Sequence, residues 1–101
     1  MDKPFRVIGA MSGSSLDGLD LAVCCFPDGD RPFNIKAART VPYPAELRRR
    51  LREAMDAPAL EAARLDRDLG RFIGEACKEL MGGAGTADLV ASHGHTLYHR
   101  P

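Results

Sequence analysis

The chain has 101 residues, which is enough for one small domain or for part of a larger one. Apolar residues make up 45% and charged residues 28%, a composition typical of folded globular proteins that argues against disorder. The formal net charge is zero, so no global electrostatic field favours nucleic acid or an anionic membrane as a partner.

The sequence pattern gives no sign of export or of a membrane span. No apolar run approaches the roughly 20 residues needed to cross a bilayer, and residues 1–15 lack the charged head and apolar stretch of a signal peptide. Cys24, Cys25 and Cys77 have no disulfide-framework spacing, so we expect reduced thiols that act as small buried hydrophobic residues. These features predict a cytoplasmic protein.

The first part of the chain predicts a β-hairpin over residues 5–26. Residues 5–10 and 19–26 are strand-like, and residues 11–18 between them are small, polar and glycine-bearing, which is typical of a turn. Alternation along the second strand predicts one apolar face made of Leu19, Leu21, Val23 and Cys25. The other face is then made of Asp20, Ala22, Cys24 and Phe26.

A third strand is predicted over residues 33–41, after a Pro-Asp-Gly-Asp turn at residues 27–30. Lys36 and Arg39 interrupt its few apolar residues. Such a strand suits the edge of a sheet.

A short helix is predicted over residues 44–56, with Pro44 in its first turn. Leu47, Leu51 and Met55 recur every four residues and predict its apolar side. We interpret the arginines on the other faces as a solvated surface rather than a phosphate-binding patch: Arg48, Arg49, Arg50 and Arg52.

A longer helix is predicted over residues 59–81, ended by glycines that begin at Gly82. Its apolar stripe consists of Leu65, Leu69, Phe72, Ile73, Ala76 and Leu80. Residues 87–92 then form a short apolar run that is typical of a buried parallel strand. The order β-β-β-α-α-β predicts an α/β fold with a mixed sheet, in which a helical crossover leads into the parallel strand. Because the chain ends soon after this strand, we interpret residues 1–101 as part of a larger protein.

The turn between the first two strands carries the first candidate site. Its small residues let backbone N–H groups converge on an anion, Ser14 and Ser15 add hydroxyl donors, and a carboxylate could hold a hydrated magnesium ion. Because the loop joins two antiparallel strands, it is neither a dinucleotide fingerprint nor a Gly-Lys-Ser/Thr phosphate loop. The alternative is an ordinary hairpin whose polar side chains only satisfy the turn backbone. The candidate phosphate-binding residues are Gly13, Ser14, Ser15, Leu16, Asp17, Gly18, Leu19 and Asp20, with Asp17 and Asp20 as the candidate magnesium ligands.

The second candidate site follows the last predicted strand and consists of His93, Gly94, His95 and Thr96. Open α/β sheets bind ligands at the carboxyl ends of their parallel strands, so these residues could hydrogen-bond a polyhydroxylated substrate. Two alternatives stay open, namely a metal site that uses His93 and His95 and histidines without a special role.

Taken together, these motifs resemble the anhydro-N-acetylmuramic acid kinases, a family of the sugar kinase/Hsp70/actin superfamily. Residues 8–20 are similar to the family pattern I-G-x-M-S-G-T-S-L-D-G-x-D, and residues 92–101 are similar to x-H-G-Q-T-x-x-H-x-P. Residues 65–72 on the long helix also match, so the resemblance covers essentially the whole chain in order. Ser14 replaces a threonine of the family pattern, and His95 replaces a glutamine.

The resemblance implies the N-terminal part of an actin- or hexokinase-like (ribonuclease H-like) ATPase lobe. It implies that ATP and Mg²⁺ bind between two lobes, with residues 13–20 on the phosphates and residues 93–96 on the sugar side. The implied reaction opens 1,6-anhydro-N-acetylmuramic acid with water and phosphorylates it to N-acetylmuramate 6-phosphate, in the recycling of peptidoglycan in a bacterial cytoplasm. The implied catalytic base is an aspartate beyond residue 101. We therefore expect no catalytic residue within the chain and no activity of the chain alone.

Three other functions are compatible with the same residues. They are a non-catalytic nucleotide sensor of the same superfamily, a metal-dependent hydrolase fragment that uses His93 and His95, and a domain that serves only assembly. Beyond the sugar and ATP we expect no nucleic-acid or membrane partner, and a homodimer of the complete protein stays open.

Overall fold

The computed structural model describes residues 5–13, 16, 18–27, 32–82 and 87–95. In chain order, these residues form β1 (Phe5–Ser12), β2 (Leu19–Phe26), β3 (Asn34–Val41), α1 (Ala45–Glu53), the 3₁₀ helix η1 (Ala54–Asp56), α2 (Ala59–Met81) and β4 (Leu89–His95). The predicted order of elements and the α/β class with a mixed sheet are confirmed.

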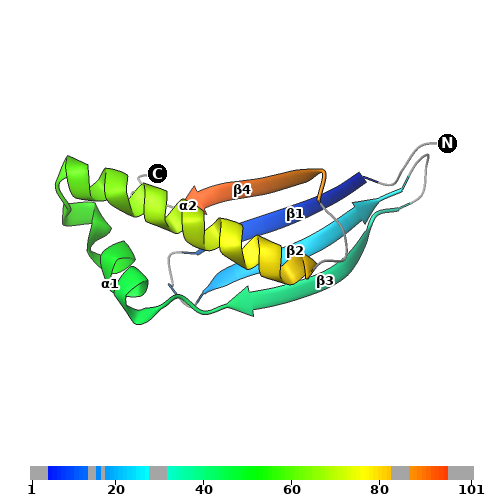
Figure 1. Ribbon diagram of the computed structural model, residues 1–101, viewed down its shortest axis with the longest axis horizontal. Helices are drawn as coiled ribbons and strands as arrows, with labels where there is room; N and C mark the ends of the chain where they lie inside the picture. Colours follow the sequence, from blue (N-terminus) through cyan, green and yellow to red (C-terminus); the bar gives the residue numbers. More distant parts are fainter. Residues whose placement is uncertain (1–4, 14–15, 17, 28–31, 83–86, 96–101) are drawn as a thin grey trace, which may run out of the picture.

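The four strands form one sheet in the order β3-β2-β1-β4 (Figure 1). β2 is antiparallel to both β1 and β3, whereas β4 returns after the helices and pairs with β1 in parallel. The predicted edge position of β3 is confirmed, and its residues from Asn34 to Thr40 are exposed. The sheet is therefore a three-stranded antiparallel meander extended by one parallel strand.

Strand β4 differs from the prediction of a buried strand at residues 87–92. It runs from Leu89 to His95, and the side chains of Leu89 and Val90 are 52% and 47% exposed. In the described part of the chain β4 pairs with β1 alone, so it forms the second edge of the sheet. The closest backbone approaches of α2 to the sheet are to β2 and β3, which leaves the apolar side chains of β4 uncovered.

A proline stands directly before each α-helix. Pro44 and Pro58 have extended ψ angles, and their carbonyls accept the first helical hydrogen bonds from Arg48 and Ala62 at 2.9 and 3.0 Å. α2 ends at Gly82, whose φ of +56° lets its N–H turn back to the Lys78 carbonyl at 3.1 Å. These local signals explain why the predicted bounds of α2, residues 59–81, are confirmed.

The predicted apolar side of the first helix is wrong at Met55. This side chain is 51% exposed, whereas the neighbouring Ala54 is 4% exposed. The reason is that Ala54–Asp56 form a 3₁₀ turn with about three residues per turn, which rotates the apolar stripe relative to an α-helix.

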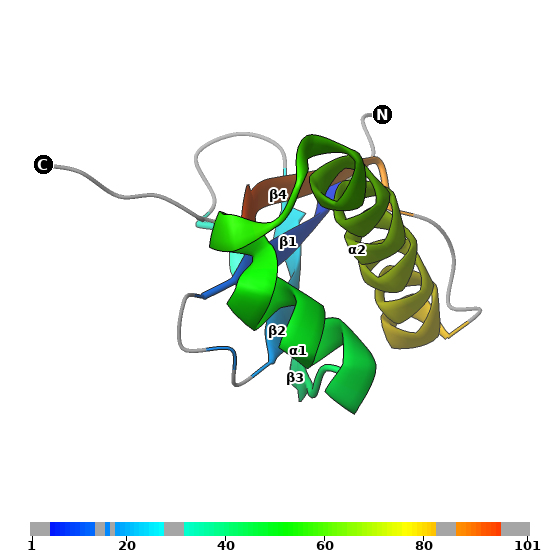
Figure 2. The ribbon, with the colours of Figure 1, turned by 90° about the vertical axis from the view of Figure 1, so that its left-hand side faces the viewer.

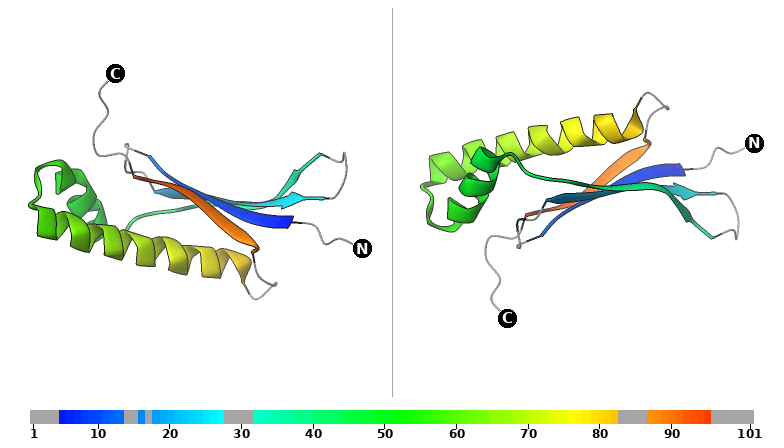
Figure 3. Two further views of the ribbon diagram at one scale, coloured as in Figure 1. Left: turned by 90° about the horizontal axis from the view of Figure 1, so that it is seen from above. Right: turned by 90° about the horizontal axis from the view of Figure 1, so that it is seen from below.

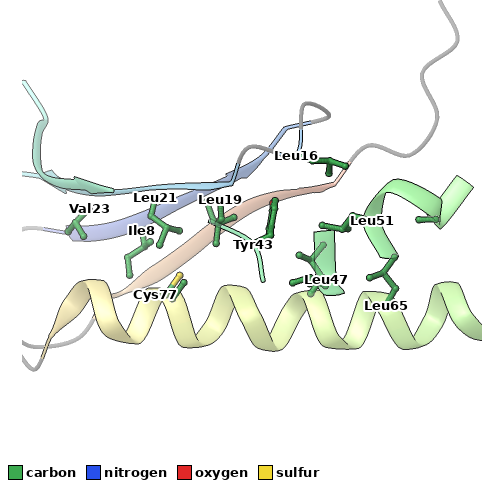
Figure 4. Packing of buried hydrophobic residues seen from close by; sticks show 14 residues of the cluster. Ile8, Leu16, Leu19, Leu21, Val23, Tyr43, Leu47, Leu51, Leu65 and Cys77 are labelled. Atoms are coloured by element: carbon green, nitrogen blue, oxygen red, sulfur yellow. The ribbon is translucent and has the colours of Figure 1, made fainter. Parts of the chain in front are cut away.

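Both helices lie on one face of the sheet, and no helix of the described chain covers the other face (Figure 3). Figure 2 shows the two helices side by side on that face. The core fills the layer between α2 and the sheet, where Ile8 and Leu19 are almost fully buried (Figure 4). The predicted buried face of β2 is confirmed for Leu19, Leu21, Val23 and Cys25.

Arg50 joins the two helices. Its guanidinium lies 2.8 Å from Asp68 Oδ2 and 3.2 Å from Glu61 Oε1 of α2, and its side chain is 19% exposed. Interpreting this arginine as part of a purely solvated face is therefore wrong. Arg49, by contrast, pairs with Glu46 and Glu53 on the exposed side of its own helix.

The cysteines are all free thiols, as expected. Cys25 and Cys77 are buried, but Cys24 is only half-buried because it lies on the face of β2 that the helices leave open. Within the described ranges of the chain, no helix combines the length and the apolar character that crossing a membrane would require.

Candidate functional site

The two predicted sites are brought to the same end of the sheet. β1, β3 and β4 run in one direction, so their carboxyl ends at Ser12, Val41 and His95 lie together (Figure 1). The turn after β1 begins at this end as well. Open α/β sheets bind their ligands at the carboxyl ends of their strands.

The described residues of the turn after β1 form a tight structure. The Leu16 N–H donates to the Gly13 carbonyl at 3.2 Å, and Leu16 has a φ of +61°, which is costly for a residue with a side chain. Burial of its side chain in the core compensates for that conformation. Because Leu16 and Leu19 are both buried, only their main-chain groups could face a phosphate. The side chains of Ser14, Ser15 and Asp17 lie outside the described residues, and their contacts stay predictions.

Gly18 lets the turn approach the end of β3. A Cβ atom at this position would lie 2.8 Å from the Val41 carbonyl oxygen and 3.0 Å from Thr40 Cγ2. The distance to the Val41 oxygen is shorter than real Cβ contacts, and this atom belongs to backbone that cannot rotate away; the distance to Thr40 Cγ2 is tighter than most Cβ contacts. Glycine is therefore required here by packing.

Asp20 lies on the sheet face opposite the helices, where it is exposed. Its Oδ1 accepts a hydrogen bond of 2.6 Å from the Thr40 hydroxyl on the neighbouring strand. Beside it, a shallow groove crosses the open face over small residues of all four strands, among them Gly9, Ala22, Ala38 and Ala91. Thr40 thus fixes the carboxylate of Asp20 at the border of an open surface.

The donor set around Asp20 suits a hydrated magnesium ion better than a fully coordinated one. Among the described residues, no group of three or more His, Cys, Asp or Glu side chains gathers in one place. Mg²⁺ usually keeps several waters and uses one or two carboxylates, so a single carboxylate at this border fits such an ion. The hydrolase alternative gains no support from the described residues, and the side chain of His93 lies outside them.

At the same end of the sheet, but on the face that the helices cover, three polar side chains meet in a cluster that the sequence analysis missed. Ser12 is 2% exposed, and its Oγ hydrogen-bonds both the Tyr43 hydroxyl and, at 2.8 Å, His95 Nδ1. Tyr43 also packs on the Phe72 ring of α2, with ring centroids 5.4 Å apart. One signal could have indicated this cluster, because Ser12 continues the buried face of Ile8 and Ala10, and a buried hydroxyl needs a partner.

A β-bulge places His95 beside Ser12. Ala10 pairs with Ser92, but two residues later Ser12 pairs with His95, so β4 contains one extra residue. Gly94 provides the conformation for this bulge, with a φ of +73°, and its N–H donates to Ser92 Oγ at 3.1 Å. In a regular register Gly94 would lie opposite Ser12, and no imidazole would reach the serine.

His95 also lines a pocket of about 340 Å³ between α2 and the end of β4. Apolar side chains of α2 form one wall, with the carboxylate-bearing Asp66 among them, and Ser92, Gly94 and His95 contribute the polar side. The structure therefore places two of the predicted substrate-side residues, Gly94 and His95, at a recess. Thr96 lies outside the described residues.

Burial raises the pKa of the Tyr43 hydroxyl above its ordinary value of 10.0. The negative charge of Asp20 acts in the same direction, and the hydrogen bond with Ser12 offsets part of the effect. Tyr43 is therefore a protonated hydroxyl at neutral pH and can act as a hydrogen-bond donor inside the cluster.

Comparison with known proteins gives a consistent result over almost the whole chain. The sequence model of the family described as anhydro-N-acetylmuramic acid kinase matches residues 5–101. The anhydro-N-acetylmuramic acid kinase of Trichormus variabilis is 37% identical over 103 aligned positions, covering 97% of this chain and 26% of the relative. That of Rhodospirillum rubrum is 39% identical, covering 93% and 26%, and that of Gloeothece citriformis is 36% identical, covering 93% and 25%. The chain thus spans about a quarter of the length of the curated relatives it matches.

Proposed function

The chain belongs to the anhydro-N-acetylmuramic acid kinase family, and from this premise we propose that it forms the N-terminal part of a two-lobe, ATP-dependent kinase. The complete enzyme opens 1,6-anhydro-N-acetylmuramic acid and phosphorylates it to N-acetylmuramate 6-phosphate, in the recycling of peptidoglycan in the cytoplasm. The family match over residues 5–101 carries this proposal. The meeting of both candidate sites at one end of the sheet supports it.

On the phosphate side, we assign residues 13–20 to the grip on ATP. Phosphoryl transfer depends on positioning and charge neutralisation more than on covalent chemistry. The main-chain groups of the turn and the hydroxyls of Ser14 and Ser15 would bind phosphate oxygens. The carboxylate of Asp20, held by Thr40, or that of Asp17 would orient the magnesium ion. Bound Mg-ATP supplies the phosphoryl group and neutralises its charge.

On the sugar side, we assign His93, Gly94, His95 and Thr96 to substrate binding, with His95 in the wall of the recess beside α2. The proposal places the catalytic aspartate and the adenine pocket beyond residue 101. The 101-residue chain alone should therefore not catalyse phosphoryl transfer. A few neutral hydrogen bonds, each contributing about 1 kcal/mol, would give it ATP affinity no better than roughly millimolar.

The test is transfer of the labelled γ-phosphoryl group of ATP to 1,6-anhydro-N-acetylmuramic acid by the complete enzyme. Replacing the phosphate-side carboxylates one at a time, as Asp20→Asn and Asp17→Ala, should lower turnover at least about tenfold for the residue that orients the metal. Asp56→Asn in η1, an exposed carboxylate outside residues 13–20 and 93–96, is the matched control and should leave turnover unchanged. No phosphorylated sugar from the unmodified enzyme would overturn the proposal. Unchanged turnover in both carboxylate variants would remove them from the site.

A further inference from the structure

We propose that Ser12 and Tyr43 are positioning residues that fix His95 as the Nε2–H tautomer, so that the proton His95 can donate to a substrate lies on Nε2. The hydrogen-bond order within the cluster is inferred from the contacts of Ser12 with Tyr43 and His95. The identity of the ligand that receives the proton rests on the proposed function. Neither Ser12 nor Tyr43 needs to touch the substrate for this role.

The argument begins with the single proton of Ser12. Its Oγ has two hydrogen-bond partners, the Tyr43 hydroxyl and His95 Nδ1. A hydroxyl donates one hydrogen bond and can accept two. If Ser12 accepted from both partners, its own proton would have no acceptor among the described residues, in a side chain that is only 2% exposed. Ser12 therefore accepts from one partner while it donates to the other. Only two orders are therefore possible. In one, Tyr43 donates to Ser12 and Ser12 donates to Nδ1. In the other, a protonated Nδ1 donates to Ser12 and Ser12 donates to Tyr43.

The acidity of the two hydroxyls favours the first order. A phenol is far more acidic than an aliphatic alcohol, so Tyr43 is the better donor and Ser12 the better acceptor. Tyr43 also stays protonated at neutral pH, because it is buried beside Phe72 and near the charge of Asp20.

Hydrogen-bond satisfaction favours the first order as well. In the reversed order the Tyr43 proton would need a second acceptor, and among the described residues Ser12 is its only hydrogen-bond partner. Tyr43 is 7% exposed, so water does not readily replace such an acceptor. In the first order every hydroxyl proton of the cluster is used, and His95 Nδ1 is the acceptor at its end. The imidazole proton then lies on Nε2.

The tautomer matters because His95 stands where the family pattern has a glutamine. A glutamine amide is both a donor and an acceptor, whereas an imidazole whose Nδ1 already accepts from Ser12 can act toward any further group only as a donor. The matching group on the substrate is therefore an acceptor oxygen, such as that of a hydroxyl, an ether or an amide. Asp66, which lines the same pocket from α2, is exposed and accepts hydrogen bonds only, so it cannot replace the donor.

The direct test is ¹⁵N NMR of the complete protein labelled at histidine, recorded at pH 8, where imidazoles are neutral. His95→Gln identifies the His95 signals by their loss. We expect the Nδ1 shift of an unprotonated acceptor and the Nε2 shift of a protonated nitrogen. Tyr43→Phe keeps the ring and removes only the hydroxyl, so it should convert His95 into a mixture of both tautomers. A protonated Nδ1 in the unmodified protein, or an unchanged tautomer in Tyr43→Phe, would overturn the proposal.

Kinetics separates a positioning role from a merely structural one. In the complete enzyme, Tyr43→Phe should raise the KM for the sugar about fivefold, the size expected for one weakened neutral hydrogen bond, with a smaller change in kcat. In a His95→Gln background, Tyr43→Phe should have no such effect, because an amide has no tautomer to fix. An equal effect in both backgrounds contradicts the proposal. A fixed tautomer in an enzyme that phosphorylates no anhydro sugar would retain the hydrogen-bond order and reject only the proposed function.

Discussion

Gly94 has a backbone conformation that only glycine adopts without cost. Its φ is +73°, and a Cβ at this position would meet no atom within 4 Å. The penalty for Gly94→Ala therefore comes from the dihedral angle alone, and we expect a loss of about 1–2 kcal/mol in the free energy of unfolding. Urea unfolding measures this loss. Gly74→Ala in α2, which also meets no atom, is the control and should stabilise the chain by about 0.5–1 kcal/mol. Equal stability of Gly94→Ala and the parent would mean that the bulge is not formed.

The thiols differ in their surroundings, and this difference predicts their reactivity. Burial raises the pKa of Cys77 above its ordinary value of 9.0, which lowers its thiolate fraction at neutral pH. Cys24 lies half-buried on the open face of the sheet. We expect one fast and two slow thiols with Ellman's reagent in the native chain, and three fast thiols in denaturant. Cys24→Ser should remove the fast phase and Cys25→Ser a slow one. A fast reaction of Cys77 would contradict its burial.

Among the elements, the turn after β1 and the end of β3 form one packed unit. Gly18→Ala would place a methyl group 2.8 Å from the Val41 carbonyl oxygen, so the strands must separate locally. We expect a loss of about 1–3 kcal/mol, the range for overpacking, together with changed amide NMR signals in β1, β2 and the end of β3. Gly9→Ala, inside β1 with no atom within 4 Å, is the matched control and should change only signals next to residue 9, leaving those at the end of β3 in place. A neutral Gly18→Ala variant would show that the turn does not press against β3.

The junction of α1 and α2 depends on the charge of Asp68. Its pKa is lowered from 3.8, first by the hydrogen bond from Arg50 and then by that from Arg67. A carboxyl group whose pKa is lower in the folded chain stabilises it above the unfolded pKa and loses this contribution as the pH falls through the folded value. Asp68→Asn should therefore be less stable than the parent at pH 7, and the difference should shrink below about pH 4.

Urea unfolding at pH 7 and pH 3 measures the two differences. Asp66→Asn, an exposed carboxylate on the same helix, is the control and should change stability little at either pH. A constant deficit of Asp68→Asn at both values would show that its cause is not the ion pair with Arg50.

How far the sequence predicts these elements depends on how local their determinants are. The bounds of α2 follow from Pro58 and Gly82, which act on the backbone beside them. The exposure of β4 could not be predicted, because an apolar run does not reveal which strands flank it or where a helix packs. The predicted burial of Met55 is wrong because apolar residues spaced four apart do not reveal a change from α-helical to 3₁₀ geometry.

The candidate site shows the same limit on the scale of the whole molecule. The turn and the residues after the last strand are contiguous motifs, and the sequence predicts both of them. The cluster of Ser12, Tyr43 and His95 joins residues 31 and 83 positions apart, and it depends on a bulge that shifts the register by one residue. Only the packed sheet and the helix above it bring these side chains together.

A single apolar layer holds the helices on the sheet, and Leu19 lies at its centre. This side chain is 0% exposed, and its strand pairs with both β1 and β3 at this residue. Leu19→Ala should therefore cost about 2–5 kcal/mol, a large part of the roughly 5–15 kcal/mol that stabilise a typical domain. Because the same layer anchors α2 and orders the sheet, helix and sheet should unfold together at lower urea, with coincident transitions in far-ultraviolet circular dichroism and tyrosine fluorescence. Val90→Ala on exposed β4 removes similar apolar bulk and should cost less than about 1 kcal/mol. Separate transitions in Leu19→Ala, or equal losses in the two variants, would show that the helices and the sheet are not held by one shared core.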